Sequence, residues 1–180
     1  MKKTNSMKLQ FVSRSANEGF ARTAVSGFLA SLDPTVEELA DIKTAVSEAV
    51  TNCIVHAYAD RIGIVYIAAD LYADGRVVIR IRDKGCGIPD VEKAMEPLFT
   101  TGGEDRAGLG FAVMQSLMDK VRVRSQVGRA PPSHWRGGSK AEGIRMTGTL
   151  SESARDRQKM IEENLGLVHS CAHRFKGRGI

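Results

Sequence analysis

The sequence has few cysteines, few aromatic residues and no long apolar run. Cys53, Cys86 and Cys171 are too few and too scattered for a disulfide framework or a zinc site, which favours a reduced, cytoplasmic setting. No stretch is apolar enough to span a bilayer, and the basic start has no apolar run behind it, so we expect neither a membrane protein nor a signal peptide. The 180 residues, 42% of them hydrophobic, fit one domain with a substantial core.

Most of the chain also lacks a surplus of charge. The net charge is +5, yet Met1–Gly128 has 16 Lys and Arg against 16 Asp and Glu. The surplus lies in Arg129–Ile180, which has ten basic and five acidic residues. A neutral domain with a basic tail does not have the uniformly basic composition typical of nucleic-acid-binding domains, so we expect no direct nucleic-acid partner.

The apolar spacing predicts a two-layer α/β (α+β) sandwich with a mixed sheet and helices on one face. Asp33 and Pro34 suit the cap and first position of a helix that runs to about Tyr58. Asp74-Gly75 is a hairpin signal between two β-rich segments. The predicted elements are strands at 8–13, 62–72, 76–82 and 120–126, helices at 17–32, 34–58 and 110–118, and a helical turn at 91–95.

The first motif lies on the second predicted helix. Glu48 and Asn52 are four residues apart, so their side chains share one face, and His56 continues that line. Mg²⁺ takes hard oxygen ligands and keeps much of its shell for water and phosphates, so one Asn oxygen suffices, while a Glu can take a proton from a hydroxyl. A solvated polar face is the alternative interpretation of this pair.

The second motif, Asp83-Lys84-Gly85-Cys86-Gly87, directly follows a strand. The Asp can accept a hydrogen bond from an exocyclic amine such as that of adenine, and the two glycines let the backbone approach a flat ring. An ordinary turn after a strand is the alternative.

The third motif, Gly108-Leu109-Gly110, opens the helix predicted at 110–118. Glycines there expose amide N–H groups at the positive end of the helix dipole, which favours phosphate; a glycine hinge is the alternative. The Walker A pattern and the Rossmann G-x-G-x-x-G pattern are absent.

The order of the three motifs resembles the signature of the GHKL ATPase and kinase superfamily. Pro97–Thr101, between the last two motifs, is similar to the start of its ATP lid. The resemblance implies that Glu48 is the general base and that Asn52 holds Mg²⁺ through the ATP phosphates. It also implies a nucleotide site with Asp83, Gly85 and Gly87 at the adenine, Thr101 in the lid, and Gly108, Leu109 and Gly110 at the phosphates.

Longer stretches resemble one family in this superfamily, the anti-sigma F factors. They lie between Met7 and Gly128 and read NEGFAR, LDPT, SEAVTNCIVHAY, IRDKGCGI and PLFTTGGEDRAGLGFAVMQSLMD. The resemblance implies a homodimer that binds the sporulation sigma factor F and blocks the transcription that this factor directs. It also implies that the protein phosphorylates a serine of an anti-anti-sigma factor with MgATP. Arg22, on the first helix, matches a residue that the family uses in partner contact; a plain surface Arg is the alternative.

Three other functions are compatible with these motifs. The chain could be an anti-sigma module that binds sigma without turnover, a stress-type anti-sigma kinase, or the catalytic domain of a histidine kinase. No helical dimerisation segment with a phospho-acceptor His precedes the domain, which disfavours the last. We interpret His56 as a packing or supporting residue, and Cys53 and Cys86 as inert small residues.

The resemblance ends near Gly128, where the family continues with Gly-Thr-Thr and a last apolar strand. Here the apolar residues of Ala130–Met146 show no helix or strand periodicity, and the proline pair in this segment cannot lie in a central strand. Read one base earlier, codons for Ala130–Trp135 can spell Gly-Thr-Thr-Val-Thr-Leu-Glu, and residues 154–179 resemble the start of a sigma-70-type core domain. These observations suggest a kinase domain at 7–128 and an atypical tail at 129–180 that is frameshift-derived or poorly ordered, with the last strand lost. A divergent tail is the alternative.

Overall fold

The computed structural model describes residues 2–96, 109–125, 127 and 143–150. Within these ranges, none of the helices combines the length and the apolarity that a membrane crossing requires. The strands are β1 (Lys3–Val12), β2 (Ile64–Tyr72), β3 (Arg76–Arg82), β4 (Lys120–Arg124) and β5 (Gly143–Thr149). The helices are α1 (Ala16–Leu29), α2 (Val36–Asn52), α3 (Val91–Ala94) and α4 (Gly110–Leu117), with a 3-10 turn η1 (Ala30–Leu32) and a π-helical turn η2 (Cys53–Ala57).

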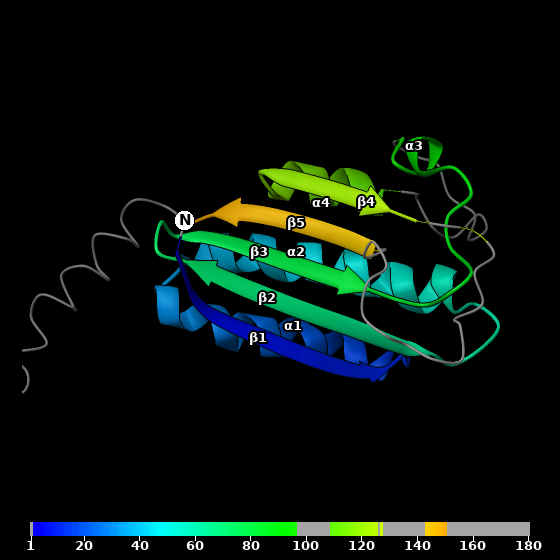
Figure 1. Cartoon of the computed structure of the whole chain (residues 1–180), viewed down its shortest axis with the longest axis horizontal. Helices are drawn as coiled ribbons and strands as arrows, with labels where there is room; N and C mark the ends of the chain where they lie inside the picture. Colours follow the sequence, from blue (N-terminus) through cyan, green and yellow to red (C-terminus); the bar gives the residue numbers. More distant parts are fainter. Residues whose placement is uncertain (1, 97–108, 126, 128–142, 151–180) are drawn as a thin grey trace, which may run out of the picture.

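The strands form one sheet in the order β1-β2-β3-β5-β4. Helices α1, α2 and α4 lie on one face of this sheet, and no described element lies on the other face (Figure 1). The predicted two-layer sandwich with helices on one face is therefore confirmed.

The core lies between the sheet and the helices. Strand residues alternate in burial because successive side chains point to opposite faces, and each large apolar side chain that is fully buried contributes about 1.5–3 kcal/mol. The largest buried side chains include Val25, Leu29, Val46 and Val50 from the helices and Ile67, Leu71, Ile79, Ile81 and Met146 from the sheet.

The expected loss of the last strand is wrong. Strand β5 lies between β3 and β4 and pairs with both, with Ile144 and Met146 buried against the core. The proline pair precedes this strand by more than ten residues, and the alternation of apolar Ile144 and Met146 with Arg145 and Thr147 suits a strand with one buried face. The sheet thus includes residues beyond the boundary predicted at Gly128.

The expectation of a mixed sheet is also wrong, because every described strand pair is antiparallel. Strands β3 and β4 are joined through helices, as parallel neighbours usually are. They do not pair with each other, because β5 is inserted between them and runs antiparallel to both.

Helix α2 begins later than the Asp33-Pro34 signal predicts. Its N-cap is Thr35, whose hydroxyl accepts from the backbone of Glu38 while the Glu38 carboxylate accepts from the backbone of Thr35. This reciprocal capping box satisfies two donors at the helix start, which a single Asp side chain cannot do. Asp33 instead takes a left-handed conformation, with φ 48°, that ends the preceding turn.

Candidate functional site

The two polar residues of α2 meet the start of α4. Glu48 is half-buried, and Asn52 is the last residue of the α-helical part. A Cβ atom built on Gly110, the first residue of α4, would lie 2.9 Å from Glu48 Oε2 and 3.6 Å from each amide atom of Asn52. The structure therefore brings together the first and third sequence motifs, which are more than fifty residues apart.

The helix changes winding directly after Asn52. Residues Cys53–Ala57 form a π-helical turn, in which residues four apart no longer lie above one another. The predicted line from Glu48 through Asn52 to His56 therefore breaks at Asn52. The Nδ2 atom of Asn52 is buried and has no hydrogen-bond partner among the described residues. A buried donor without a partner is costly, and it marks this side chain as one able to serve a ligand.

The Asp83 loop packs against the π-helical turn. The Asp83 carboxylate accepts from the backbone N–H of Gly85 at 2.9 Å, and the N–H of Cys86 donates to the carbonyl of Ala57 at 3.0 Å. A Cβ on Gly85 would lie 2.1 Å from the Ala57 oxygen, so only glycine allows this approach. Gly87 has a φ of 77°, which also favours glycine.

Cys53 connects the π-helical turn to the same loop. Its thiol donates to Asp83 Oδ2 at 3.5 Å. Burial, and then the nearby Asp83 charge, raise the pKa of the Cys53 thiol well above its usual value. Cys53 therefore stays a protonated thiol at neutral pH. It supports the orientation of Asp83, a role that the sequence interpretation of an inert residue did not include.

Tyr58 is the main structural residue that the sequence analysis missed. Its hydroxyl donates to the Ile64 carbonyl at 2.9 Å and accepts from the Lys84 backbone N–H at 2.7 Å. It thus ties the end of the π-helical turn to the start of β2 and to the Asp83 loop. Burial raises the pKa of Tyr58, so the hydroxyl keeps its proton at neutral pH. An aromatic residue at a helix end normally indicates core packing, so the sequence carries no clear signal of this role.

Replacing Tyr58 with Phe is expected to lower the melting temperature and weaken nucleotide binding. The change leaves the Ile64 carbonyl and the Lys84 N–H without their partner, at a cost of about 1–3 kcal/mol. Thermal denaturation and nucleotide titration measure the two effects. Tyr72→Phe is the matched control, because no hydrogen bond of the Tyr72 hydroxyl occurs within the described ranges. Equal behaviour of the two variants would show that the Tyr58 hydroxyl does not hold the loop.

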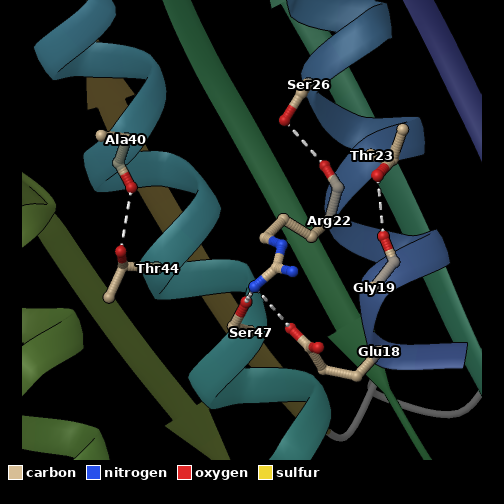
Figure 2. Close-up of polar contacts among 8 residues, drawn as sticks. All are labelled: Glu18, Gly19, Arg22, Thr23, Ser26, Ala40, Thr44 and Ser47. Carbon is tan, nitrogen blue, oxygen red and sulfur yellow. Dashed lines mark hydrogen bonds and ion pairs between the residues drawn. The ribbon is translucent and has the colours of Figure 1, made fainter. Parts of the chain in front are cut away.

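Arg22 extends from α1 toward α2, next to the Glu48 region. Its guanidinium lies 3.4 Å from Ser47 Oγ and 3.4 Å from Glu18 Oε1 (Figure 2). The Arg22 side chain is still 45% exposed. The Arg22 side chain therefore reaches from α1 to Ser47 on α2, next to Glu48. Much of the side chain remains exposed to solvent.

Two predicted nucleotide ligands, Thr101 and Gly108, lie outside the described residues. Leu109 is described as the N-cap residue of α4 and is 40% exposed. No side chain caps this helix start within the described residues. The first backbone N–H groups of α4 thus lie beside Glu48 and Asn52 without a side-chain cap, at the positive end of the helix dipole.

Comparison with known proteins identifies the family. Residues 11–130 match the model of the histidine kinase-like ATPase domain. The anti-sigma F factor of Caldanaerobacter subterraneus subsp. tengcongensis is 58% identical over 130 residues, which cover 72% of this chain and 90% of that protein. The chain belongs to the anti-sigma F factor family. The family member from Geobacillus kaustophilus is 54% identical over 127 residues, 69% of this chain and 86% of that protein.

A solved structure supports the fold. The crystal structure of the RsbU and RsbW domains of a Mycobacterium tuberculosis protein aligns with a TM-score of 0.52 and 19% identity. The alignment covers 83% of this chain and 33% of that chain. The chain thus has the fold of a histidine kinase-like ATPase domain.

The described residues fit the nucleotide that this domain family uses. The buried Nδ2 of Asn52 has no hydrogen-bond partner among the described residues, the start of α4 offers N–H groups without a side-chain cap there, and glycine at 110 leaves space beside Glu48. Carboxamide oxygen suits Mg²⁺, and amide N–H groups at a helix start suit phosphate. The Asp83 carboxylate accepts from the Gly85 N–H of its own loop, which fixes where its oxygens lie.

Proposed function

We propose that the chain is an anti-sigma factor and an ATP-dependent protein serine/threonine kinase. It binds the sporulation sigma factor F and blocks the transcription that this factor directs. It also phosphorylates a serine of an anti-anti-sigma factor. The observation that carries the proposal is the convergence of Glu48 and Asn52 on the first residue of α4. The names of the relatives support the sigma partner.

The chain's own residues divide the work of phosphoryl transfer. Bound MgATP would supply the γ-phosphoryl group, with the metal neutralising its charge. Asn52 would hold Mg²⁺ through its amide oxygen, the N–H groups of Leu109 and Gly110 would bind the phosphates, and Asp83 would orient the adenine. Glu48 accepts the proton of the incoming serine hydroxyl, which makes its oxygen a better nucleophile.

Arg22 is the proposed partner contact of this site. Its guanidinium lies beside Ser47, the residue that precedes the general base Glu48, and its side chain is about half exposed. A cation there can bind an acidic partner residue while the partner's serine lies near Glu48. We also propose that the chain acts as a cytoplasmic homodimer, as the family resemblance implies.

The test combines two measurements on the full chain. Purified protein is incubated with γ-labelled ATP, Mg²⁺ and a cognate anti-anti-sigma protein, and sigma-dependent transcription is measured in parallel. Label on the partner's serine together with blocked transcription supports both activities. Blocked transcription without label would mean that the protein is a sigma-binding module and not a kinase. The absence of both label and blocked transcription would reject the proposal.

We further propose that a frameshift replaced the family ending after Gly128. The 58% identical relative is matched over 90% of its length but over only 72% of this chain, which agrees with an unrelated C-terminal part. Strand β5 would then be a substitute strand encoded in the new frame. Resequencing the DNA for residues 126–146 tests this origin. An unambiguous in-frame read followed by an unrelated gene would reject it.

A further inference from the structure

The five strands carry nine basic residues and one acidic residue, Asp70. Because Met1–Gly128 as a whole is neutral, this imbalance comes from placement and not from overall composition. We call the nine residues the basic strand set: Lys3, Lys8, Arg76, Arg80, Arg82, Lys120, Arg122, Arg124 and Arg145.

The basic strand set lies on the face of the sheet that the helices leave open. In β4, Val121 and Val123 pack against the core, whereas Lys120, Arg122 and Arg124 are exposed. In the other strands the same alternation turns most apolar residues toward the helices and the basic residues away from them. Val78 is the exception, because it lies on the side of the arginines and is itself buried. No described element covers the open face (Figure 1).

Strand register aligns four of these cations in one row. Lys8 pairs with Ala68, which pairs with Arg80; Arg80 in turn pairs with Arg145, and Arg145 with Arg122. Neighbouring strands are about 4.8 Å apart, so three arginines occupy about 10 Å of the sheet surface. Like charges directly opposite each other are destabilising, so the row lowers the stability of the fold.

The described residues neutralise little of this charge. Asp70 forms ion pairs with Lys3, at 2.8 Å, and with Arg80. Burial alone would raise the pKa of Asp70, but Lys3 and Arg80 outweigh burial and lower it, so Asp70 stays ionised and engaged. The other seven members of the basic strand set form no ion pair with any described residue.

The chemistry of the face favours an acidic protein segment over other occupants. A five-stranded sheet is too wide to enter a nucleic-acid groove. The two tyrosine rings of this face, Tyr66 and Tyr72, already lie under Lys84 and Arg76, so neither of them is open for base stacking. A second copy would bring two basic faces together. Arg129–Ile180 has ten basic and five acidic residues, so its charge does not match either.

We propose that the open face of the sheet, centred on Arg80, Arg145 and Arg122, is a docking surface for an Asp/Glu-rich segment of a protein partner. The planar guanidinium groups bind carboxylates in a bidentate manner, and docking would neutralise Arg145 and Arg122, which form no ion pair with any described residue. This surface is separate from the candidate nucleotide site, and the proposal does not depend on kinase activity.

The test measures binding of a short fluorescent Asp/Glu-rich peptide to the full chain by anisotropy. Arg122→Gln/Arg145→Gln is expected to weaken binding by about tenfold, because two charge-assisted contacts are removed. The control Arg14→Gln/Lys43→Gln loses the same charge away from the basic strand set and is expected to bind like the unchanged protein. The Arg122/Arg145 variant should also melt no lower than the unchanged protein, because repulsion in the row is relieved.

Three results would overturn the proposal. Equal losses in both double variants would mean that only net charge matters. Tighter binding of a single-stranded oligonucleotide than of the peptide, lost in the same variant, would reassign the face to nucleic acid. A change in oligomeric state caused by Arg122→Gln/Arg145→Gln alone, seen by sedimentation, would make the face an interface between two copies. ATP binding, measured on every variant, reports whether each one is folded.

Discussion

Glu48→Gln is expected to slow phosphate transfer to the anti-anti-sigma serine by about 10²–10⁴-fold. Gln keeps the size and shape of Glu but cannot take the proton of the serine hydroxyl. ATP affinity should change little, because Asn52, the start of α4 and the Asp83 loop remain in place. Single-turnover transfer of labelled phosphate and equilibrium nucleotide titration measure the two quantities separately.

The control for this experiment is Glu37→Gln, an exposed carboxylate in the first turn of the same helix. It removes the same charge from α2 and should leave transfer unchanged. A Glu48→Gln protein that transfers phosphate at the unchanged rate would remove Glu48 from the role of general base. Loss of ATP binding in that variant would instead assign Glu48 to nucleotide binding, for which its position beside Gly110 gives the reason.

Local patterns predicted most of the fold. A helix that carries Glu48 and Asn52, the hairpin at Asp74-Gly75 and the strand 76–82 are confirmed. Each depends on residues close in sequence, where period and turn chemistry act directly. The cap of α2 was misplaced by two residues because Asp33 and Thr35 are both good cap residues, and the choice depends on the reciprocal bond to Glu38.

Strand β5 could not be predicted, because its stability comes from distant partners. A seven-residue segment carries a weak strand signal of its own when the sequence before it has no apolar periodicity. It is a strand because its backbone pairs with both β3 and β4, and because Ile144 and Met146 are buried in the core. The antiparallel character of the sheet follows from the same insertion and was missed for the same reason.

The candidate site divides in a similar way. The spacing of Glu48 and Asn52 and the glycines of the two loops are readable in the sequence, and the structure brings Glu48, Asn52 and Gly110 together. The residues that support them are not readable, because Tyr58 and Cys53 act through contacts with Lys84 and Asp83, which lie 26 and 30 positions away. The charge count likewise hid the basic face, since a neutral total says nothing about which side of a sheet the cations occupy.

Gly85→Ala is expected to weaken nucleotide binding by about fivefold or more, since overpacking a tight contact costs about 1–3 kcal/mol. The new methyl group would meet the Ala57 carbonyl oxygen at 2.1 Å. The backbone fixes the position of the new Cβ atom and the oxygen belongs to the main chain, so no side-chain rotation relieves the contact. The loop must move away from the π-helical turn, and with it the Cys86 N–H leaves the same carbonyl.

Gly27→Ala is the matched control, because a Cβ atom at Gly27 on α1 meets nothing within 4 Å. Alanine favours a helix interior over glycine by up to about 1 kcal/mol, so this variant should melt higher and bind nucleotide normally. Nucleotide titration and thermal denaturation of both variants separate a displaced loop from a general loss of stability. If Gly85→Ala bound ATP as tightly as the unchanged protein, the contact of the Asp83 loop with the π-helical turn would not position the adenine. The proposed role of Asp83 would then have no structural support, because this contact and the bond to the Gly85 N–H fix where its carboxylate lies.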